Sequence, residues 1–487
     1  MQKIEISPMT RLEGHGKISL FLDDNGNVDN AFVQTVEFRG YERFLTGLPI
    51  EEVPRTVSTV CGVCRGVHFT AAAKATDGVY GVEPTPTAKK IRELFLNAHY
   101  VEDHCAILYA LGFPDFVMGP TSDPAGRNLI GLISAVGAET GKLVLKKRFS
   151  AVKIIEMIGG KPLHSVAALP GGWSKSISEE ERLQMLELSK DLVELGQITL
   201  KVFEDVVLKN EKYMELVVGD SYKAIVNYMA TVDDNGKCTY YDGTQKVIDL
   251  NGKEILRFKG KEYLNVIAER TLPWSYLKMP YLKSIGWKGV VDGEGTGLYA
   301  VGPLARFNVC NGFTTPQAQE HYEKMLAAFG GKKPVHNILA YHWARAIELL
   351  NAAEKVQELL SDKSITDPDV RAQLTNKPNE GVGIIEAVRG TLIHHYKTDE
   401  NGIVTEANLI VATTNNKGPI NVAVRRAAKS FIKNGIINEG LINMVEMAYR
   451  PYDICFACAT HALPGRMPLE IDVYEKNGTH VKNLRNF

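Results

Sequence analysis

Apolar and polar residues alternate through residues 1–40, and this pattern predicts β-strands. Two such runs, Lys17 to Leu22 and Val28 to Val36, flank Asn25-Gly26. Asn-Gly between strand-like runs is a strong signal for a β-hairpin. Further strands are expected over residues 230–265, over residues 383–413 with a turn at Asn401-Gly402, and in the tail on either side of Asn477-Gly478.

From Thr87 onward the period lengthens, because apolar residues between Ile91 and Leu108 recur at steps of three and four. That spacing predicts an amphipathic helix, which Pro114 is expected to close. Further helices are expected over residues 127–158, over 178–218 after a capping box of Ser178 and Glu181, from Thr315-Pro316, over 335–361 and over 420–434.

Helices dominate the pattern and short β units stand near both ends, so the predicted fold class is α+β. We expect a core of long helices, with small β units near both termini enclosing a buried metal site. The expected segments are 1–85 with an N-terminal β unit and the first Cys-x-x-Cys pair, 86–229 as helical core, 230–312 as a β or irregular insertion, and 313–461 as helical core with a β unit and the second pair.

The composition is that of a globular protein, with 487 residues, 45% hydrophobic and 23% charged. The formal net charge of −1 gives no bulk field that would recruit nucleic acid or an anionic membrane. No run approaches the roughly 18 apolar residues of a membrane span, and Met1 to Ile6 does not begin a signal peptide. The simplest expectation is a cytoplasmic protein.

The seven cysteines give the first chemical signal, because four of them form two Cys-x-x-Cys pairs at opposite ends of the chain. An odd count in a long chain is not typical of a disulfide framework. The remaining three are expected to be buried thiols that pack as small apolar groups: Cys105, Cys238 and Cys310. The pairs and the histidine that follows each are Cys61 and Cys64 with His68, and Cys455 and Cys458 with His461.

Two distant pairs of thiols are compatible with more than one kind of metal or redox site. Four thiolates bind structural zinc, although the strong zinc signal places its pairs about 15–20 residues apart. A redox dithiol explains one pair better than two. Four thiolates also hold an iron–sulfur cluster or a thiolate-rich transition metal. Spacing alone leaves zinc, a cluster and a catalytic metal open.

Charged residues near the two pairs favour a catalytic metal. Structural zinc does not need them, whereas a site that moves protons requires an acid or base within reach. These residues are Glu13, Arg39, Glu42, Asp103, His104, Arg389 and Asp453.

At these motifs the chain resembles the large, catalytic subunit of nickel–iron hydrogenases. The resemblance runs over the whole length and is most specific at the two cysteine motifs. The residues at two motifs, His394-His395-Tyr396 and Ala459-Thr-His-Ala-Leu, are most similar to those of the cytosolic, deazaflavin-independent (methyl-viologen-reducing) type of methanogenic archaea. The other matching motifs are Thr10-Arg-Leu-Glu-Gly-His15, Phe38-Arg-Gly-Tyr-Glu42, Val101-Glu-Asp-His104, Val301-Gly-Pro-Leu-Ala-Arg306, Arg389-Gly-Thr-Leu and Val411-Ala-Thr-Thr-Asn.

The resemblance implies a nickel site and a set of residues around it. The four paired cysteines would hold nickel, with Cys64 and Cys458 bridging to an iron that carries carbon monoxide and cyanide. Glu13 would pass protons to and from the Cys458 thiolate. The pocket for the diatomic ligands would be lined by His68, Arg389 and Thr413. Asp103 and Asp453 would hold Arg389, and His104 would be a further residue around the metal ligands. A second, hard metal, Mg²⁺ or Fe²⁺, would be held by Glu42, the Leu409 carbonyl and His461.

The implied reaction is reversible heterolytic cleavage of H₂, with Glu13, Arg389 and Cys458 as catalytic residues. A thiolate is the preferred base, because a guanidinium gives up its proton very reluctantly. Electrons must leave, and the three scattered cysteines cannot bind a cluster chain, so an iron–sulfur small subunit is expected. The resemblance adds a further electron-transfer subunit, heterodisulfide reductase, and a maturation protease that removes residues 462–487 as a pro-segment.

Three positions depart from the family pattern without removing a ligand: Thr59 stands where the family usually has Arg, and Val388 and Ile454 each stand where it usually has Pro. The rival classes are a zinc-stabilised structural protein and a non-catalytic homologue like the quinone-module subunit of respiratory complex I. Such a homologue has lost the cysteines, and the four cysteines present here argue against it.

Overall fold

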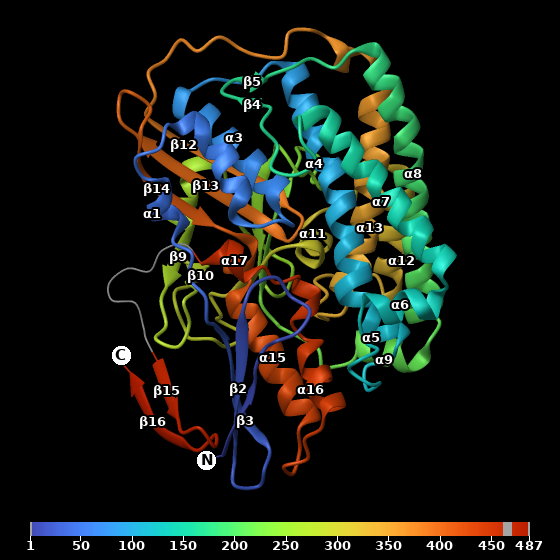
Figure 1. Ribbon diagram of the computed structural model, residues 1–487, viewed down its shortest axis with the longest axis vertical. Helices are drawn as coiled ribbons and strands as arrows, with labels where there is room; N and C mark the ends of the chain where they lie inside the picture. Colours follow the sequence, from blue (N-terminus) through green and yellow to red (C-terminus); the bar gives the residue numbers. More distant parts are fainter. Residues whose placement is uncertain (1, 461–469, 486–487) are drawn as a thin grey trace.

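A layer of long helices stands beside a group of small β-sheets in the computed structural model, which describes residues 2–460 and 470–485 (Figure 1). The predicted α+β class is therefore confirmed. The longest helices, drawn on the right of Figure 1, are α4 (Pro86–Ile107), α7 (Ala138–Gly159), α8 (Glu179–Phe203) and α13 (Ala340–Ser361). α13 packs on both α4 and α8, and α7 also packs on both, so the four form one bundle.

Two expected helix boundaries were wrong. Pro114 does not close a helix, because it lies at the start of α5 (Phe113–Val117), where its missing N–H costs nothing. A short π-helical turn, Leu108–Gly112, joins α4 to α5. The helix expected over residues 127–158 is broken at Gly137, whose φ of 91° lies outside the helical region, into α6 (Leu129–Val136) and α7.

The helix that opens after Ser178 has the predicted capping box. The Ser178 hydroxyl accepts from the Glu181 N–H, and the Glu181 carboxylate accepts from the Ser178 N–H. The helix does not run unbroken to Val218. After α8 a π-helical turn, Glu204–Leu208, leads to α9 (Glu211–Val218).

Three small sheets lie where strands were expected. The N-terminal sheet has the order β1-β2-β3 and contains the predicted hairpin. Parallel pairing of β11 with β6 brings residues 299–300 to the edge of the middle sheet. The strands are β1 (Gln2–Ile6), β2 (Gly16–Leu22), β3 (Val28–Thr35), β6 (Asn227–Val232), β7 (Thr244–Ile248), β8 (Glu254–Phe258), β11 (Tyr299–Ala300), β12 (Glu380–Ala387), β13 (Gly390–Thr398) and β14 (Val404–Ile410).

The remaining elements connect these layers. The short strand pairs are β4 (Ala168–Leu169) with β5 (Gly172–Trp173), and β9 (Ile267–Arg270) with β10 (Met279–Leu282). The other helices are α1 (Tyr41–Leu45), α2 (Val53–Val57), α10 (Tyr263–Val266), α11 (Pro303–Val309), α12 (Pro316–Ala328), α14 (Ala412–Asn415), α15 (Lys417–Phe431) and α16 (Glu439–Glu446). Near the C-terminus, β15 (Glu470–Tyr474) and β16 (His480–Arg485) form the predicted tail hairpin.

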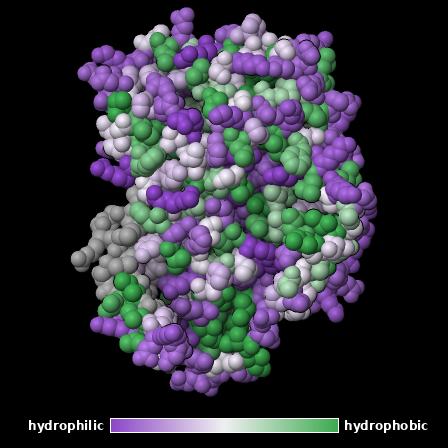
Figure 2. Space-filling view, viewed as in Figure 1, coloured by the Kyte–Doolittle hydropathy of each residue, from purple (hydrophilic) through white to green (hydrophobic). Residues whose placement is uncertain are grey.

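Polar side chains cover most of the face shown in Figure 2, and a hydrophobic group lies at the right over α6 and α7. Leu129, Ile130 and Leu145 are exposed apolar residues of these two helices. Among the helices of the described residues, none has the length and apolar character needed to cross a membrane.

Helix α3 (Arg65–Tyr80) lies on β12 at a distance that only glycine permits. A Cβ added to Gly383 would stand 2.2 Å from the carbonyl oxygen of Ala71 and 2.6 Å from the backbone nitrogen of Ala75. Both neighbours are backbone atoms, so neither can turn away. This contact fixes the height of α3 above the sheet, and α3 begins directly after Cys64.

We expect Gly383→Ala to lower the free energy of unfolding by about 3 kcal/mol, because the new methyl group must push α3 off the sheet. The measurement is the midpoint of chemical denaturation. Gly126→Ala is the matched control, since a Cβ there would meet its nearest neighbour only at 3.7 Å. Equal midpoints for the two variants would contradict the close packing.

Candidate metal centre

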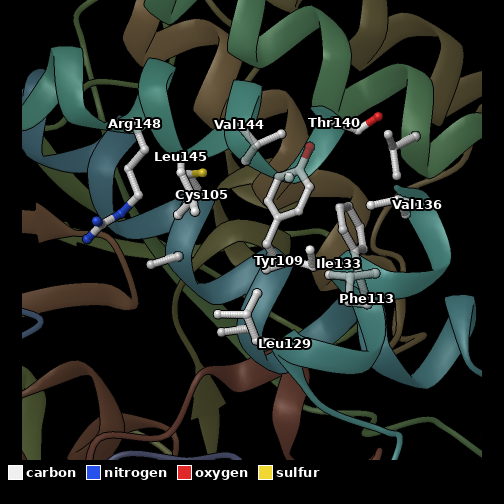
Figure 3. Close-up of a pocket in the computed structure, with 15 residues that line it drawn as sticks. Cys105, Tyr109, Phe113, Leu129, Ile133, Val136, Thr140, Val144, Leu145 and Arg148 are labelled. Atoms are coloured by element: carbon white, nitrogen blue, oxygen red, sulfur yellow. The ribbon is translucent and has the colours of Figure 1, made fainter. Parts of the chain in front are cut away.

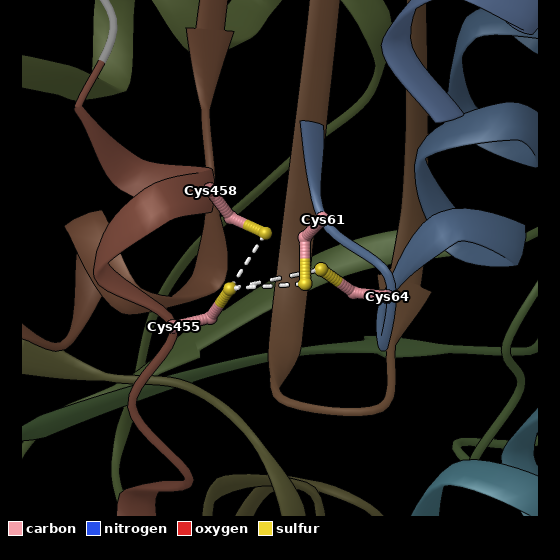
Figure 4. Close-up of side chains that lie close together, drawn as sticks. All are labelled: Cys61, Cys64, Cys455 and Cys458. Carbon is pink, nitrogen blue, oxygen red and sulfur yellow. Dashed lines mark hydrogen bonds between the residues drawn. The ribbon is translucent and has the colours of Figure 1, made fainter. Parts of the chain in front are cut away.

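The two cysteine pairs meet in the interior, as Figure 4 shows. All four Sγ atoms lie within 4.8 Å of one another and all four residues are buried. Cys455 Sγ is 3.6 Å from that of Cys61 and 3.8 Å from that of Cys64. Sulfurs bound to one tetrahedral metal at about 2.3 Å are themselves roughly 3.8 Å apart. Cys455 and Cys458 Sγ are closer, at 2.7 Å, and the four thiols together are compact enough to share one metal centre.

Both pairs occupy junctions between elements, which hold the thiols on rigid backbone. Cys61 ends a 3-10 turn, Ser58–Val60, and Cys64 is the N-cap residue of α3. Cys455 is the N-cap residue of α17 (Phe456–Ala459), which also carries Cys458. Each thiol is thus directed by the end of a helix rather than by a free loop.

The N-terminal motif joins the second pair by backbone hydrogen bonds. Glu13 N–H donates to the Ile454 carbonyl at 3.1 Å, and Phe456 N–H donates to the Glu13 carbonyl at 2.9 Å. Glu13 and Cys455 form an isolated parallel bridge. Residues from the two ends of the chain are therefore held in register at the metal centre.

Buried ion pairs anchor the residues before Glu13. Arg11 pairs with Asp115 and donates to Asn443 Oδ1 at 3.0 Å, while Thr10 N–H donates to Glu446 at 2.9 Å. Arg450 binds both Asp115 and Glu446 and closes the cluster. Sequence reasoning missed these partners, because lone acidic residues far apart in the chain carry no local signal.

Without a bound cation, three of the four thiols favour the protonated, uncharged form. Hydrogen bonds from Cys455, Cys458 and Cys64 lower the pKa of Cys61, whereas burial raises the pKa of each of the other three. A bound metal cation would remove the remaining protons, because its charge compensates thiolates that burial otherwise disfavours. The donor set therefore fits a soft transition metal.

The structure corrects the expected partner of Glu13. Its Oε2 lies 2.8 Å from Cys455 Sγ, whereas the family resemblance paired Glu13 with Cys458. The backbone bridge to Cys455 explains this difference, because it sets the Glu13 side chain beside the first thiol of the pair. Burial and the Cys61 thiolate raise the pKa of Glu13, which is half-buried.

Arg389 lies where the motifs predict, between two buried aspartates. Its Nη1 is 3.3 Å from Asp103 Oδ2, its Nη2 is 3.0 Å from Asp453 Oδ1, and its Nε donates to the Asp453 carbonyl at 2.9 Å. Burial opposes the charge, but the two carboxylates outweigh it and raise the pKa of Arg389 well above its usual value. Nη2 forms an ion pair without hydrogen-bond geometry, so its protons remain available.

His104 does not join this group by direct contact. Its Nε2 is 3.2 Å from Glu348 Oε2, and Glu348 also accepts from Arg306 at 2.5 Å. Arg306 in turn donates to the carbonyls of Ala387 and Val388, directly before Arg389. The effect of His104 on Arg389 is therefore indirect and passes through the backbone.

Thr413 and His68 lie beside the cysteine pairs. The Thr413 hydroxyl oxygen accepts from the Cys455 N–H at 3.1 Å, which leaves the hydroxyl proton free to be donated elsewhere. His68 N–H donates to the Cys64 carbonyl, and burial lowers the pKa of its ring to about 4. The imidazole is therefore neutral at physiological pH.

The residues expected at a second metal converge on the free edge of β14. Glu42 is buried and accepts from Leu409 N–H at 2.8 Å. The N–H and C=O of one strand residue point to the same side, so the Leu409 carbonyl faces this edge too. Arg39 and Gly40 N–H both donate to the Thr460 carbonyl, which brings the residues after Cys458 alongside. The expected ligand His461 lies outside the described residues.

Further polar groups near these sites were missed from the sequence. Lys278 Nζ is 3.8 Å from Glu42 and 3.1 Å from Glu269. Arg345 donates to the Pro451 carbonyl at 2.8 Å, and its charge acts on Asp453. Neither Lys278 nor Arg345 belongs to a sequence motif, and only the tertiary structure brings them close to Glu42 and Asp453.

An apolar cavity of about 190 Å³ lies apart from the metal centre, between α4, α6 and α7 (Figure 3). Cys105, Tyr109 and Leu132 are among its lining residues. Cys105 is buried there, as expected of a structural thiol, and burial raises its pKa to about 12. None of the residues predicted to act at the metal lines this cavity.

Comparison with known proteins defines the class. A family model described as nickel-dependent hydrogenase matches residues 39–122 and 231–461, and a HoxL-like model matches residues 3–38. The chain belongs to the nickel-dependent hydrogenase family, and the prediction of an oxidoreductase acting on H₂ is confirmed.

Individual relatives narrow the class. The chain is 68% identical, over the full length of both proteins, to an iron-sulfur subunit of the F420-non-reducing hydrogenase of Archaeoglobus profundus. It is 41% identical to a vhu subunit of the F420-non-reducing hydrogenase of Methanocaldococcus jannaschii, over 89% of this chain and all of the other. The predicted similarity to the archaeal, deazaflavin-independent type is confirmed by these names.

Solved structures share the fold. One, titled as a crystal structure of NAD⁺-reducing [NiFe]-hydrogenase in the H₂-reduced state, has a TM-score of 0.87 and 36% identity, covering 95% of this chain and 100% of the other. A nickel–iron–selenium hydrogenase from D. vulgaris Hildenborough, at 22% identity and a TM-score of 0.72, covers 94% of this chain and 100% of the other. It supports the fold alone.

Glu42 predicts a pH dependence of stability in the metal-free chain. Burial raises its pKa from 4.5 to about 7, although Lys278 and the Leu409 N–H oppose the shift. The fold favours the protonated form of Glu42. Its contribution to the free energy of unfolding is therefore full below pH 4.5 and is lost as the pH rises through 7. The largest expected loss is about 3 kcal/mol.

In the presence of a chelator, Glu42→Gln should therefore become more stable relative to the unmodified chain between pH 4.5 and pH 8. Denaturant unfolding at several pH values measures the difference. Glu139→Gln removes a carboxylate whose side chain is 89% exposed and should show no such trend. A difference for Glu42→Gln that does not change with pH would rule out the perturbed carboxyl.

Proposed function

We propose that the four-cysteine cluster holds a nickel–iron centre with carbon monoxide and cyanide on the iron, and that the chain cleaves H₂ reversibly into protons and electrons there. The observation that carries this proposal is the buried set of four thiols with a half-buried carboxyl 2.8 Å from one of them. All four cysteines would hold nickel, and Cys64 and Cys458 would also hold the iron. A structural zinc site would not need a carboxyl in contact with one of its thiols, as Glu13 is with Cys455.

The bound centre supplies the Lewis acid that makes heterolytic cleavage of H₂ possible. The chain supplies the path for the proton. In this proposal Cys455 Sγ receives the proton and Glu13 takes it up across the 2.8 Å contact. The raised pKa of Glu13 suits the role, because a proton carrier must bind its proton at the working pH and release it again.

Arg389 acts in this proposal as a fixed cation rather than as the base. Two aspartates hold it in place, and its protonated form is strongly favoured. The unused protons on Nη2 and the Thr413 hydroxyl proton are donors for the cyanide and carbon monoxide pocket. The chain thereby supplies hydrogen bonds to small anionic ligands at a site from which water is largely excluded.

The second metal is proposed at Glu42, the Leu409 carbonyl and His461. Oxygen ligands with one imidazole suit Mg²⁺ or Fe²⁺. A cation there would offset the cost of ionising the buried Glu42, and this balance supports the assignment. The role of His461 remains a prediction.

The electrons released from H₂ require a partner subunit that accepts them. Beyond the metal cluster only Cys105, Cys238 and Cys310 remain, so we propose an iron–sulfur small subunit that takes the electrons. Gly62 is exposed between the first pair of cysteines, and a partner that docks there would come close to the metal. The wider proposal includes a further electron-transfer subunit, heterodisulfide reductase as acceptor, and cleavage by a maturation protease after His461.

Metal analysis of the mature complex tests the centre. We expect nickel and iron in the chain and infrared bands from bound carbon monoxide and cyanide. Cys458→Ala should abolish H₂ oxidation and remove the bands, because the proposed iron then loses a bridging ligand. Cys105→Ala, which removes a buried thiol outside the cluster, should retain both. Zinc as the only metal, with no bands in the unmodified complex, would end the hydrogenase assignment of this site.

Exchange between H₂ and D₂O tests the proton path. Glu13→Gln keeps the size of the side chain but cannot carry the proton, and it should slow exchange by roughly 10²-fold or more. Nickel content should stay unchanged. Glu139→Gln is the control, because its side chain is 89% exposed on α7 and has no contact with a cysteine among the described residues. Normal exchange in Glu13→Gln would assign the proton to another group.

A further inference from the structure

A polar pocket of about 380 Å³ lies where the first residues of the chain meet α16. Two arginines line it, Arg11 from the segment after β1 and Arg127 from the loop before α6. None of the residues proposed to hold a metal or to move a proton is among its lining residues. The pocket is therefore separate from the metal centre, and the mechanism above gives it no role.

Arg127 is almost fully buried without a counter-ion. It is 7% exposed, yet its guanidinium makes a single hydrogen bond among the described residues, from Nη1 to the Pro120 carbonyl at 2.9 Å. Its Nε has no partner there, and no described carboxylate oxygen lies within 4 Å of it. A guanidinium carries five N–H donors, and an unpaired buried charge is costly. Burial lowers the pKa of Arg127 for this reason.

Arg11 presents a second guanidinium to the same pocket. Its Nη1 donates to the Leu111 carbonyl at 3.0 Å, and its Nη2 binds Asp115 and Asn443, so Nε is left without a described partner. The backbone φ of Arg11 is 54°, in the left-handed region that residues other than glycine rarely adopt. Strain of this kind is found where a side chain is held for a ligand.

The charges behind the pocket do not balance. Three guanidiniums, those of Arg11, Arg127 and Arg450, share two buried carboxylates, those of Asp115 and Glu446. The two carboxylates also act on Arg127 by charge, although neither binds it. One positive charge is therefore in excess, and a ligand with one negative charge would compensate it.

The remaining carboxylates of the pocket indicate how much charge a ligand can carry. Glu5 is paired with Lys3 at 2.7 Å and with Lys17 at 3.2 Å. Glu439, the first residue of α16, is exposed and forms no ion pair with a described residue. Its charge opposes a second negative charge in the pocket, which disfavours phosphate. A carboxylate has a single charge and two oxygens that match guanidinium donors.

We propose that this pocket binds a small monocarboxylate, with Arg127 as its main ligand and Arg11 as a second donor. The inference goes beyond the cleavage of H₂ and does not depend on which metal the cysteines hold. Binding makes and breaks no covalent bond. The carboxylate accepts hydrogen bonds that the two guanidiniums otherwise give to water, in a pocket where the chain has already oriented them.

Thermal unfolding of the mature complex tests the proposal, with sodium acetate replacing sodium chloride at constant ionic strength and pH 7. A ligand that binds only the folded state raises the midpoint with a saturating dependence on its concentration. Arg127→Gln should raise the acetate concentration for half of the effect by about 10-fold or more, since a charge-assisted bond is lost. Arg426→Gln is the matched control and should respond as the unmodified complex does, because Arg426 lines another pocket and has its counter-ion, Asp292, at 2.6 Å.

Glu439→Gln provides a second, opposite test that does not disturb the arginines. Removal of the opposing charge should lower the acetate concentration for half of the effect by roughly threefold. The proposal is overturned if the midpoint of the unmodified complex does not respond to acetate, if Arg127→Gln responds equally, or if inorganic phosphate stabilises more than acetate does. Should Arg127→Gln not fold, an unchanged or weaker response of Glu439→Gln overturns it.

Discussion

The parallel bridge between Glu13 and Cys455 is the contact on which the rest of the centre depends. It consists of two backbone hydrogen bonds, yet it joins the two ends of the chain and sets a carboxyl beside a thiol. Backbone bonds fix direction better than a flexible side chain does. A displacement of about 1 Å at such a site is enough to weaken catalysis strongly.

Around this bridge, buried charge is balanced in separate groups. Arg389 has Asp103 and Asp453, and Arg306 has Glu348 and Glu386. A buried charge without a partner is costly, and removing one member of a pair leaves the other uncompensated. These pairs therefore specify one arrangement of the interior rather than add much stability. Both converge on the segment that contains Arg389, which explains how a cation can be held beside four thiols.

The departures from the family pattern fit this view. Val388 and Ile454 each replace a proline directly before a residue of the centre. In both places a hydrogen bond to the backbone carbonyl supplies the rigidity that the ring would give, since the Arg306 guanidinium donates to the Val388 carbonyl and the Glu13 N–H donates to the Ile454 carbonyl. Thr59 is bonded to the Thr56 carbonyl in a short helical turn, and nothing in the structure explains the loss of charge there.

The sequence by itself determined the α+β class, the hairpins at Asn25-Gly26 and Asn401-Gly402, and the four cysteines, because hydrophobic period, turn chemistry and ligand spacing are local properties. It failed at Pro114 and Gly137, where a helical run changes type or breaks without a local signal strong enough to place the boundary. Tertiary structure alone decided that Glu13 meets Cys455 rather than Cys458, that His104 bonds Glu348 rather than Arg389, and that His394 meets His68. These contacts span hundreds of residues or cross between a strand and a helix, and their geometry depends on packing that no local pattern encodes.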